Sequence, residues 1–177
     1  MAKPRILGGI AKGQILHTPP RGTRPSPSRL REALFDILSF RSRGSFLDLY
    51  SGSGAFGLEA ASRGFQVTCV EIRSEAVRVI WQNAQRLGLS VRCIRQDALK
   101  FVRSSEERFD ILVASPPYPL DLEPLFQQIL VSGVVEAGGV YIFQHPTQLM
   151  LSLDLPDTTS KTVRKKYGSN SLTLVYV

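Results

Sequence analysis

Residues 47–57 read Leu-Asp-Leu-Tyr-Ser-Gly-Ser-Gly-Ala-Phe-Gly. An apolar run that begins at Phe46 ends in three glycines, and a helix-forming segment follows at once and closes at Gly64. This order predicts a strand, a tight turn and a helix start, the arrangement by which an α/β sheet brings its backbone against a nucleoside-containing cofactor. The glycines also fit the G-x-G-x-x-G spacing of dinucleotide sites, so the stretch alone leaves the class of cofactor open.

From residue 45 onward, strand and helix patterns alternate. Strands are expected at 45–50, 67–72, 91–96, 109–114 and 138–143, and helices at 55–63, 74–87, 98–104 and 121–132. Strands such as Ile111-Leu112-Val113-Ala114 are apolar without alternation, which is typical of a parallel sheet covered on both faces. Segments 161–167 and 171–177 flank Gly168-Ser169-Asn170 and predict a hairpin. The sequence therefore predicts an α/β fold, a doubly wound Rossmann-like sheet of seven mostly parallel strands closed by an antiparallel hairpin.

The N-terminal part has a different pattern. Residues 1–23 are expected to form a short basic β-hairpin and a proline-rich connector, and residues 24–177 the main domain. The first helix of that domain is expected to begin with Ser26 as its cap and Pro27 at its first position. Its buried stripe is predicted to be Leu30, Ala33, Leu34, Ile37 and Leu38. Arg29 and Arg31 are then expected on the exposed face.

Length and composition exclude several classes of protein. A chain of 177 residues with 43% hydrophobic content suits one globular domain. It contains no apolar run of 18 residues, and its N-terminus lacks the apolar core of a secretory signal, so we expect a cytoplasmic protein without membrane contact. Cys69 and Cys93 fall in predicted strands and predict no disulfide framework. His17 and His145 are isolated, so no metal is expected. We expect a monomer.

The net charge of +7 is unevenly distributed. Residues 1–43 carry +7 and residues 161–177 carry +4, whereas residues 44–160 carry −4. Basic ends around an acidic centre suggest that the ends bind a polyanion while the centre binds a small molecule. A merely soluble basic protein is the alternative explanation.

Three carboxylates are expected at the carboxyl edge of the sheet. Glu71 ends the second strand, where a carboxylate accepts hydrogen bonds from both ribose hydroxyls of a nucleoside, and Ile72 follows it to line an adenine face. Asp48 either holds a cofactor ammonium or caps the glycine loop. Asp97 either accepts from an adenine amino group or caps the next helix.

Ser115-Pro116-Pro117-Tyr118 follows the fourth strand, in the crevice where open α/β sheets bind ligands. Two prolines stiffen this turn and remove two donors, so its carbonyls and the Ser115 hydroxyl are available to accept from an exocyclic amine. Tyr118 offers a flat face on which a base can stack. A simple proline-rich turn is the alternative.

Together these features resemble the class I S-adenosylmethionine-dependent methyltransferases that act on an exocyclic nitrogen. Residues 23–26, 29–35, 48–54, 57–60 and 164–168 are similar to bacterial enzymes that methylate guanine N2 in 16S ribosomal RNA. The resemblance implies S-adenosylmethionine as cofactor, and 16S ribosomal RNA or the small ribosomal subunit as partner. It implies cofactor contacts from Asp48, Tyr50, Gly52, Gly54, Gly57, Glu71, Ile72, Asp97 and Ala98. It implies catalysis by Ser115, Pro116, Pro117 and Tyr118, and RNA binding by Arg24, Arg29, Arg31, Lys165 and Lys166.

One residue departs from the family pattern, because Ser115 stands where the rRNA enzymes have Asp. A neutral acceptor then replaces a charged one, at a cost of about 1 kcal/mol. The sequence leaves three alternatives open. They are an NAD-dependent dehydrogenase, a cofactor-binding RNA assembly factor with little turnover, and a methyltransferase for adenine N6 or a glutamine side chain.

Overall fold

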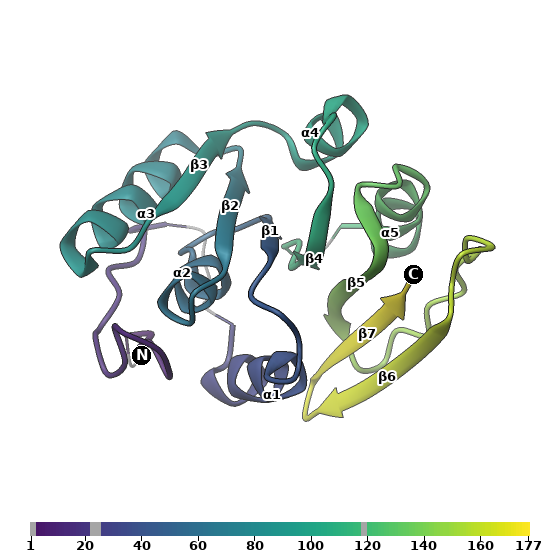
Figure 1. Ribbon diagram of the computed structural model, residues 1–177, viewed down its shortest axis with the longest axis horizontal. Helices are drawn as coiled ribbons and strands as arrows, with labels where there is room; N and C mark the ends of the chain where they lie inside the picture. Colours follow the sequence, from purple (N-terminus) through teal and green to yellow (C-terminus); the bar gives the residue numbers. More distant parts are fainter. Residues whose placement is uncertain (1–2, 22–25, 118–119) are drawn as a thin grey trace.

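The computed structural model describes residues 3–21, 26–117 and 120–177. Within these ranges, seven strands form one sheet in the order β3-β2-β1-β4-β5-β7-β6 (Figure 1). The strands are β1 (Ser45–Leu49), β2 (Gln66–Glu71), β3 (Val91–Arg95), β4 (Phe109–Ala114), β5 (Val135–Pro146), β6 (Lys161–Tyr167) and β7 (Asn170–Tyr176). The helices are α1 (Ser28–Leu38), α2 (Ala55–Ser62), α3 (Ser74–Leu87), α4 (Ala98–Ser104) and α5 (Leu122–Val131). The predicted fold class is confirmed.

The strand order reverses between β1 and β4. β1 pairs in parallel with β2 on one side and with β4 on the other. β5 continues the parallel part, whereas β7 pairs antiparallel with both β5 and β6. In open α/β sheets, ligands bind outside the carboxyl ends of the strands at such a reversal. The topology therefore directs attention to the ends of β1 and β4.

Helices cover both faces of the sheet. α1, α2 and α3 lie on one side, and α4 and α5 lie on the other (Figure 1). On the α1 side, the rings of Phe35, Phe46 and Phe65 pack within 5.7–6.5 Å of one another. On the α5 side, the rings of Phe126 and Phe143 stack at 4.4 Å. Apolar side chains therefore fill two layers, as the unalternated strand sequences predict.

The N-terminal segment packs on the domain as part of its core. The predicted β-hairpin is reduced to one antiparallel bridge, between Arg5 and Ile15. Ile6, Ala11 and Leu16 are buried in the α1-side core. The segment is held mainly by this burial and by bonds to α2, where Ser62 Oγ accepts from Ala11 N at 2.9 Å. Tertiary packing thus takes the place of an extended hairpin ladder.

Two expectations about the first helix are wrong. Ser26 does not cap α1, because Pro27 is the N-cap residue and the Ser26 hydroxyl instead donates to Gln144 Oε1 at 3.1 Å. Arg31 is not on the surface, because only 1% of it is exposed. The N-terminal segment covers this side of α1, and Arg31 Nη2 donates to Arg5 O at 3.0 Å. Burial lowers the pKa of the Arg31 guanidinium, an effect that the nearby charge of Glu59 opposes.

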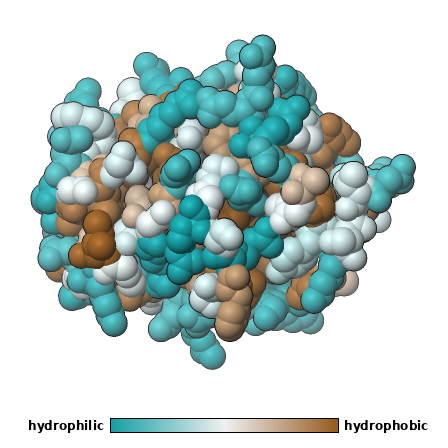
Figure 2. Space-filling model, viewed as in Figure 1, coloured by the Kyte–Doolittle hydropathy of each residue, from teal (hydrophilic) through white to brown (hydrophobic). Residues whose placement is uncertain are grey.

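The surface is mixed in character. On the face shown in Figure 2, hydrophilic residues predominate and hydrophobic ones form separate small areas. Among the described residues, no helix combines the length and the apolar content needed to cross a membrane. Cys69 and Cys93, which are register partners on β2 and β3, are both free thiols.

Candidate active site at the carboxyl edge of the sheet

The glycine loop turns sharply between β1 and α2. Gly52 and Gly54 have φ angles of 57° and 75°, in the left-handed region that favours glycine. Tyr50 has a φ of 59° and is the one non-glycine residue in the described ranges with a positive φ. Such strain concentrates at functional sites. At Gly57 a Cβ would lie 2.4 Å from Cys69 Sγ, so glycine lets α2 pack closely on the sheet.

Asp48 is buried beneath this loop. Its Oδ2 accepts a hydrogen bond from Gly57 N at 3.0 Å, so the carboxylate caps the start of α2. Its Oδ1 is also buried and has no hydrogen-bond partner among the residues that the structure describes. Burial raises the pKa of Asp48 to about 7, although the Gly57 hydrogen bond opposes the shift. The capping role is therefore observed, and one acceptor atom is left for a cationic ligand.

Glu71 joins the ends of β1 and β2. Its Oε2 accepts from Gly52 N at 2.8 Å, and its Oε1 accepts from Arg73 N at 3.0 Å and from Arg73 Nε at 3.3 Å. Asp97 caps α4, because its Oδ1 accepts from Lys100 N at 2.9 Å. The expected capping role of Asp97 is thus observed.

A small cavity lies between Glu71 and Asp97 at the carboxyl ends of β2 and β3. It is lined by Tyr50, Val70, Glu71, Ile72, Gln96, Asp97 and Ala98. Five of them were predicted as cofactor residues, and Val70 and Gln96 were not. Ile72 is 59% exposed, which is unusual for an isoleucine at the end of a central strand and leaves an apolar face beside the carboxylates. The signal for Gln96 was its position just before Asp97, at the end of β3.

The Ser115-Pro116 corner lies beside the glycine loop. β1 and β4 pair through Leu49 and Ala114, so Tyr50 and Ser115 are the residues that follow this pair, and Ser115 N still donates to Leu49 O at 3.3 Å. The Ser115 hydroxyl is buried and has no partner within the described ranges. Pro116 is buried and Pro117 is exposed. Tyr118 lies outside the described residues, so its stacking role stays a prediction.

The predicted RNA-binding residues fall into different environments. Arg29 is exposed on α1, and Lys165 and Lys166 are exposed on the edge strand β6. Arg31 is buried, so its guanidinium is not available to a phosphate. Arg24 lies outside the described residues. Of the five predicted residues, Arg29, Lys165 and Lys166 therefore lie on the surface that the structure describes.

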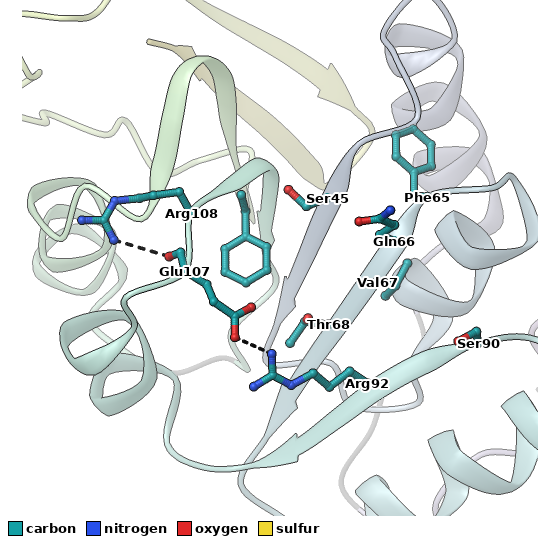
Figure 3. A pocket seen from close by; sticks show the side chains of 10 residues that line it. Ser45, Phe65, Gln66, Val67, Thr68, Ser90, Arg92, Glu107 and Arg108 are labelled. Carbon is teal, nitrogen blue, oxygen red and sulfur yellow. Dashed lines mark hydrogen bonds and ion pairs between the residues drawn. The ribbon is translucent and has the colours of Figure 1, made fainter.

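A larger cavity, of about 600 Å³, lies at the opposite edge of the sheet (Figure 3). Its lining comes from the amino ends of β1 to β4 and includes Thr68, Arg92 and Glu107. Arg92 Nη1 pairs with Glu107 Oε1 at 2.5 Å across this groove. The parts of the chain covered by the structure contain no group of three His, Cys, Asp or Glu residues that could hold a metal ion.

Residues 4–176 match the family model described as Conserved hypothetical protein 95. The chain belongs to this family. The hypothetical protein TTHA0928 of Thermus thermophilus is 47% identical, with a TM-score of 0.88 over 98% of this chain and 99% of that one.

Relatives with named activities are more distant. "Putative rRNA methyltransferase YlbH" of Bacillus subtilis is 27% identical over 98% of this chain and 97% of its own. Ribosomal RNA small subunit methyltransferase D of Escherichia coli is 33% identical, over 64% of this chain and 60% of that relative. Release factor glutamine methyltransferase of Bordetella pertussis is 35% identical over 54% of this chain and 36% of its own. The resemblance to rRNA methyltransferases that the sequence predicts is confirmed.

Proposed function

We propose that the protein transfers a methyl group from S-adenosylmethionine to the exocyclic N2 amine of a guanine in small-subunit ribosomal RNA. The pairing of Leu49 with Ala114 carries this proposal, because it brings the glycine loop and the Ser115-Pro116 corner to one point at the reversal of strand order. A donor site and an acceptor site for methyl transfer must be adjacent in this way. The protein is expected to act as a monomer in the cytoplasm.

The residues around the glycine loop fit the cofactor. Asp48 Oδ1, which has no partner among the described residues, is suited to the ammonium group of the cofactor, and that charge also favours the ionised form of this carboxyl. Glu71 is suited to the ribose hydroxyls and the exposed Ile72 to one face of the adenine. Asp97 and Ala98 line the cavity where the adenine amino group would lie. Gly52, Gly54 and Gly57 allow the backbone to approach the amino-acid end.

The Ser115-Pro116-Pro117 corner would bind the amine. Its carbonyls and the Ser115 hydroxyl accept hydrogen bonds from the N2 protons, which localises the nitrogen lone pair and aligns it for attack. Bound S-adenosylmethionine would supply the methyl carbon and release a neutral thioether, and the amine held by this corner would give up one proton to water. The corner contributes alignment and the exclusion of water.

The exposed basic residues would bind the RNA backbone. Ser26 and Asn170 both hydrogen-bond to Gln144, so the start of α1 and the β6–β7 turn lie together near the Ser115 corner. Arg29 and the pair Lys165 and Lys166 extend from these two elements. Phosphate contacts of this kind position a substrate without reading its sequence. The guanine itself would be unstacked from the RNA to enter the site.

Two observations favour this function over its rivals. A dehydrogenase accounts for the glycine loop and Glu71, but it gives no role to the buried Ser115 hydroxyl. Glutamine methylation is supported by a relative that covers about half of this chain, whereas the YlbH alignment covers nearly all of it. Ribosomal RNA is therefore the preferred substrate.

Methyl transfer with labelled S-adenosylmethionine tests the proposal. Small ribosomal subunits and naked 16S rRNA from cells that lack this gene serve as substrates, and nucleoside mass spectrometry identifies the product. We expect N2-methylguanosine, and we expect Lys165→Gln with Lys166→Gln to raise KM more than they lower kcat. A methyl group on adenine N6, or label in the proteins of the subunit instead of its RNA, would contradict the proposal. Cofactor binding without any transfer would favour the assembly-factor alternative.

A further inference from the structure

The end of β5 lies beside the Ser115 corner. β4 and β5 pair in parallel through Ala114 and Phe143, so Ser115 and Gln144 follow this pair on neighbouring strands. Ala114 and Phe143 both belong to the core on the α5 side. Successive strand residues point to opposite faces, and Ser115 still pairs with β1 one residue past the end of β4, through its N–H to Leu49 O, so Ser115 and Gln144 both fall on the α1 side. The two side chains therefore leave the sheet next to each other.

The Gln144 amide is held in place by two hydrogen bonds. Ser26 Oγ donates to its Oε1 at 3.1 Å, and its Nε2 donates to Asn170 Oδ1 at 3.3 Å. Only 9% of Gln144 is exposed. These contacts join the start of α1, the end of β5 and the β6–β7 turn. Ser26 and Gln144 are 118 residues apart in the sequence. The plane of the amide is thus fixed by three elements.

The amide has further hydrogen-bonding capacity. A glutamine side chain has two N–H groups and two oxygen lone pairs, and the contacts to Ser26 and Asn170 use one of each. One donor and one acceptor remain on the same amide. Next to N2, the Watson–Crick edge of guanine presents one donor, N1–H, and one acceptor, O6. A single amide can therefore pair with both of these guanine groups.

We infer that Gln144 is a specificity-determining residue that reads the guanine beside Ser115. Its Oε1 accepts from N1–H and its Nε2 donates to O6, while the Ser115 hydroxyl accepts from the N2 amine. This inference rests on the proposed function and adds to it the residue that recognises the base. A glutamine that merely joined three elements would affect stability and all ligands alike.

Nucleoside binding separates these two roles. The probes are guanosine and 2-aminopurine riboside, which keeps the 2-amino group but lacks O6 and the N1 proton. Affinities are measured by calorimetry on the full chain saturated with S-adenosylhomocysteine. We expect the native protein to prefer guanosine by about tenfold or more, since one or two buried hydrogen bonds are lost with the analogue. Gln144→Met is expected to remove this preference and leave the affinity for S-adenosylhomocysteine unchanged.

Controls keep the test decisive. Gln66→Met changes an exposed glutamine at the amino edge and should retain the full preference. If Gln144→Met fails to fold, Gln144→Asn retains a polar amide but shortens its reach by one methylene, and it should lose the preference in the same way. Equal binding of the two probes by the native protein, or an undiminished preference in a folded Gln144 variant, would overturn the inference.

Failure of the inference is distinguishable from failure of the proposed function. If the native protein methylates guanine N2 in small subunits and the Gln144 variants keep the guanosine preference, only the role of Gln144 is wrong. In the methyl-transfer assay, we expect Gln144→Met to lower kcat/KM about tenfold. If the native protein transfers no methyl group to RNA, the proposed function itself is wrong.

Discussion

The two edges of the same sheet differ in how their polar groups are satisfied. At the amino edge, where the larger cavity lies, Asp110 Oδ2 accepts from Ser45 N at 2.7 Å and from Ser45 Oγ at 2.9 Å, and Arg92 pairs with Glu107. At the carboxyl edge, Asp48 Oδ1 and Ser115 Oγ are buried without a partner in the described part of the chain. An unsatisfied buried polar group is costly, so it persists where a ligand completes it. Cavity size alone would have selected the amino edge.

The largest expected effect concerns the buried carboxyl at the carboxyl edge. The pKa of Asp48 rises from 3.8 to about 7 through burial. Between pH 3.8 and pH 7, this carboxyl is ionised in the unfolded chain but still protonated in the folded chain. The free energy of unfolding therefore falls as pH rises through this range, by up to about 4 kcal/mol in total, and it levels off above pH 7. The Asp48→Asn variant has no carboxyl to titrate at this position, so its free energy of unfolding should not show this fall. Its stability relative to the native protein should therefore increase from pH 4 to pH 8.

Denaturant unfolding without cofactor, at several pH values, measures this change. Asp110→Asn at the amino edge is the matched control, because it weakens the acceptor for two Ser45 hydrogen bonds and should destabilise the protein. A constant difference between Asp48→Asn and the native protein across this pH range would show that Asp48 does not keep its proton on folding.

A pair of glutamates gives the second comparison. Glu71 is 7% exposed and accepts from Gly52 and Arg73, whereas the Glu107 side chain is 53% exposed. Glu71→Gln removes a charged acceptor for the ribose hydroxyls and should weaken S-adenosylhomocysteine binding about 100-fold. Glu107→Gln should leave that affinity unchanged. Calorimetry on both variants measures these affinities. If Glu71→Gln binds S-adenosylhomocysteine as tightly as the native protein does, Glu71 is not part of the cofactor site.

The two serines give a smaller contrast. Ser115→Ala should lower kcat about tenfold, because the amine loses one acceptor. Ser115→Asp should turn over as fast as the native protein or faster, by roughly five- to tenfold. Ser45→Ala at the amino edge should cost about 1 kcal/mol of stability and leave kcat unchanged. A folded Ser115→Asp protein with no activity would contradict the acceptor role of this position.

The smallest effect is expected from the ion pair across the groove. Both side chains of the Arg92–Glu107 pair are more than half exposed, so water screens their attraction. Arg92→Gln should change the free energy of unfolding by less than about 1 kcal/mol and should not alter methyl transfer. A large loss of activity in this variant would indicate that the amino edge takes part in function.

Much of the fold could be predicted because its signals are local. The strand patterns predicted the ends of β1, β2, β3 and β4 to within one residue, and Gly88, with a φ of 64°, ends α3 as its position suggests. Only β5 is longer than expected, running from Val135 to Pro146 rather than over 138–143. The strand ends then located the glycine loop, Glu71 and Ser115 at one edge.

The errors involve contacts between distant parts of the chain. Periodicity alone does not show that the N-terminal segment covers a second side of α1, so it predicts an exposed Arg31, whereas the structure buries this residue beside Arg5. Ser26 looked like a helix cap, but its partner is Gln144, 118 residues away. Gln144 itself carried no local signal, because its relation to Ser115 depends on which strands are neighbours in the sheet.

The most direct test is a crystal structure of the protein with S-adenosylhomocysteine. We predict that the bound sulfur lies where β1 and β4 end, between Tyr50 and Ser115, with the adenine against Ile72. Density in the groove beside Arg92, or none at saturating ligand, would show that the glycine turn and the proline corner do not form one methyl-transfer site.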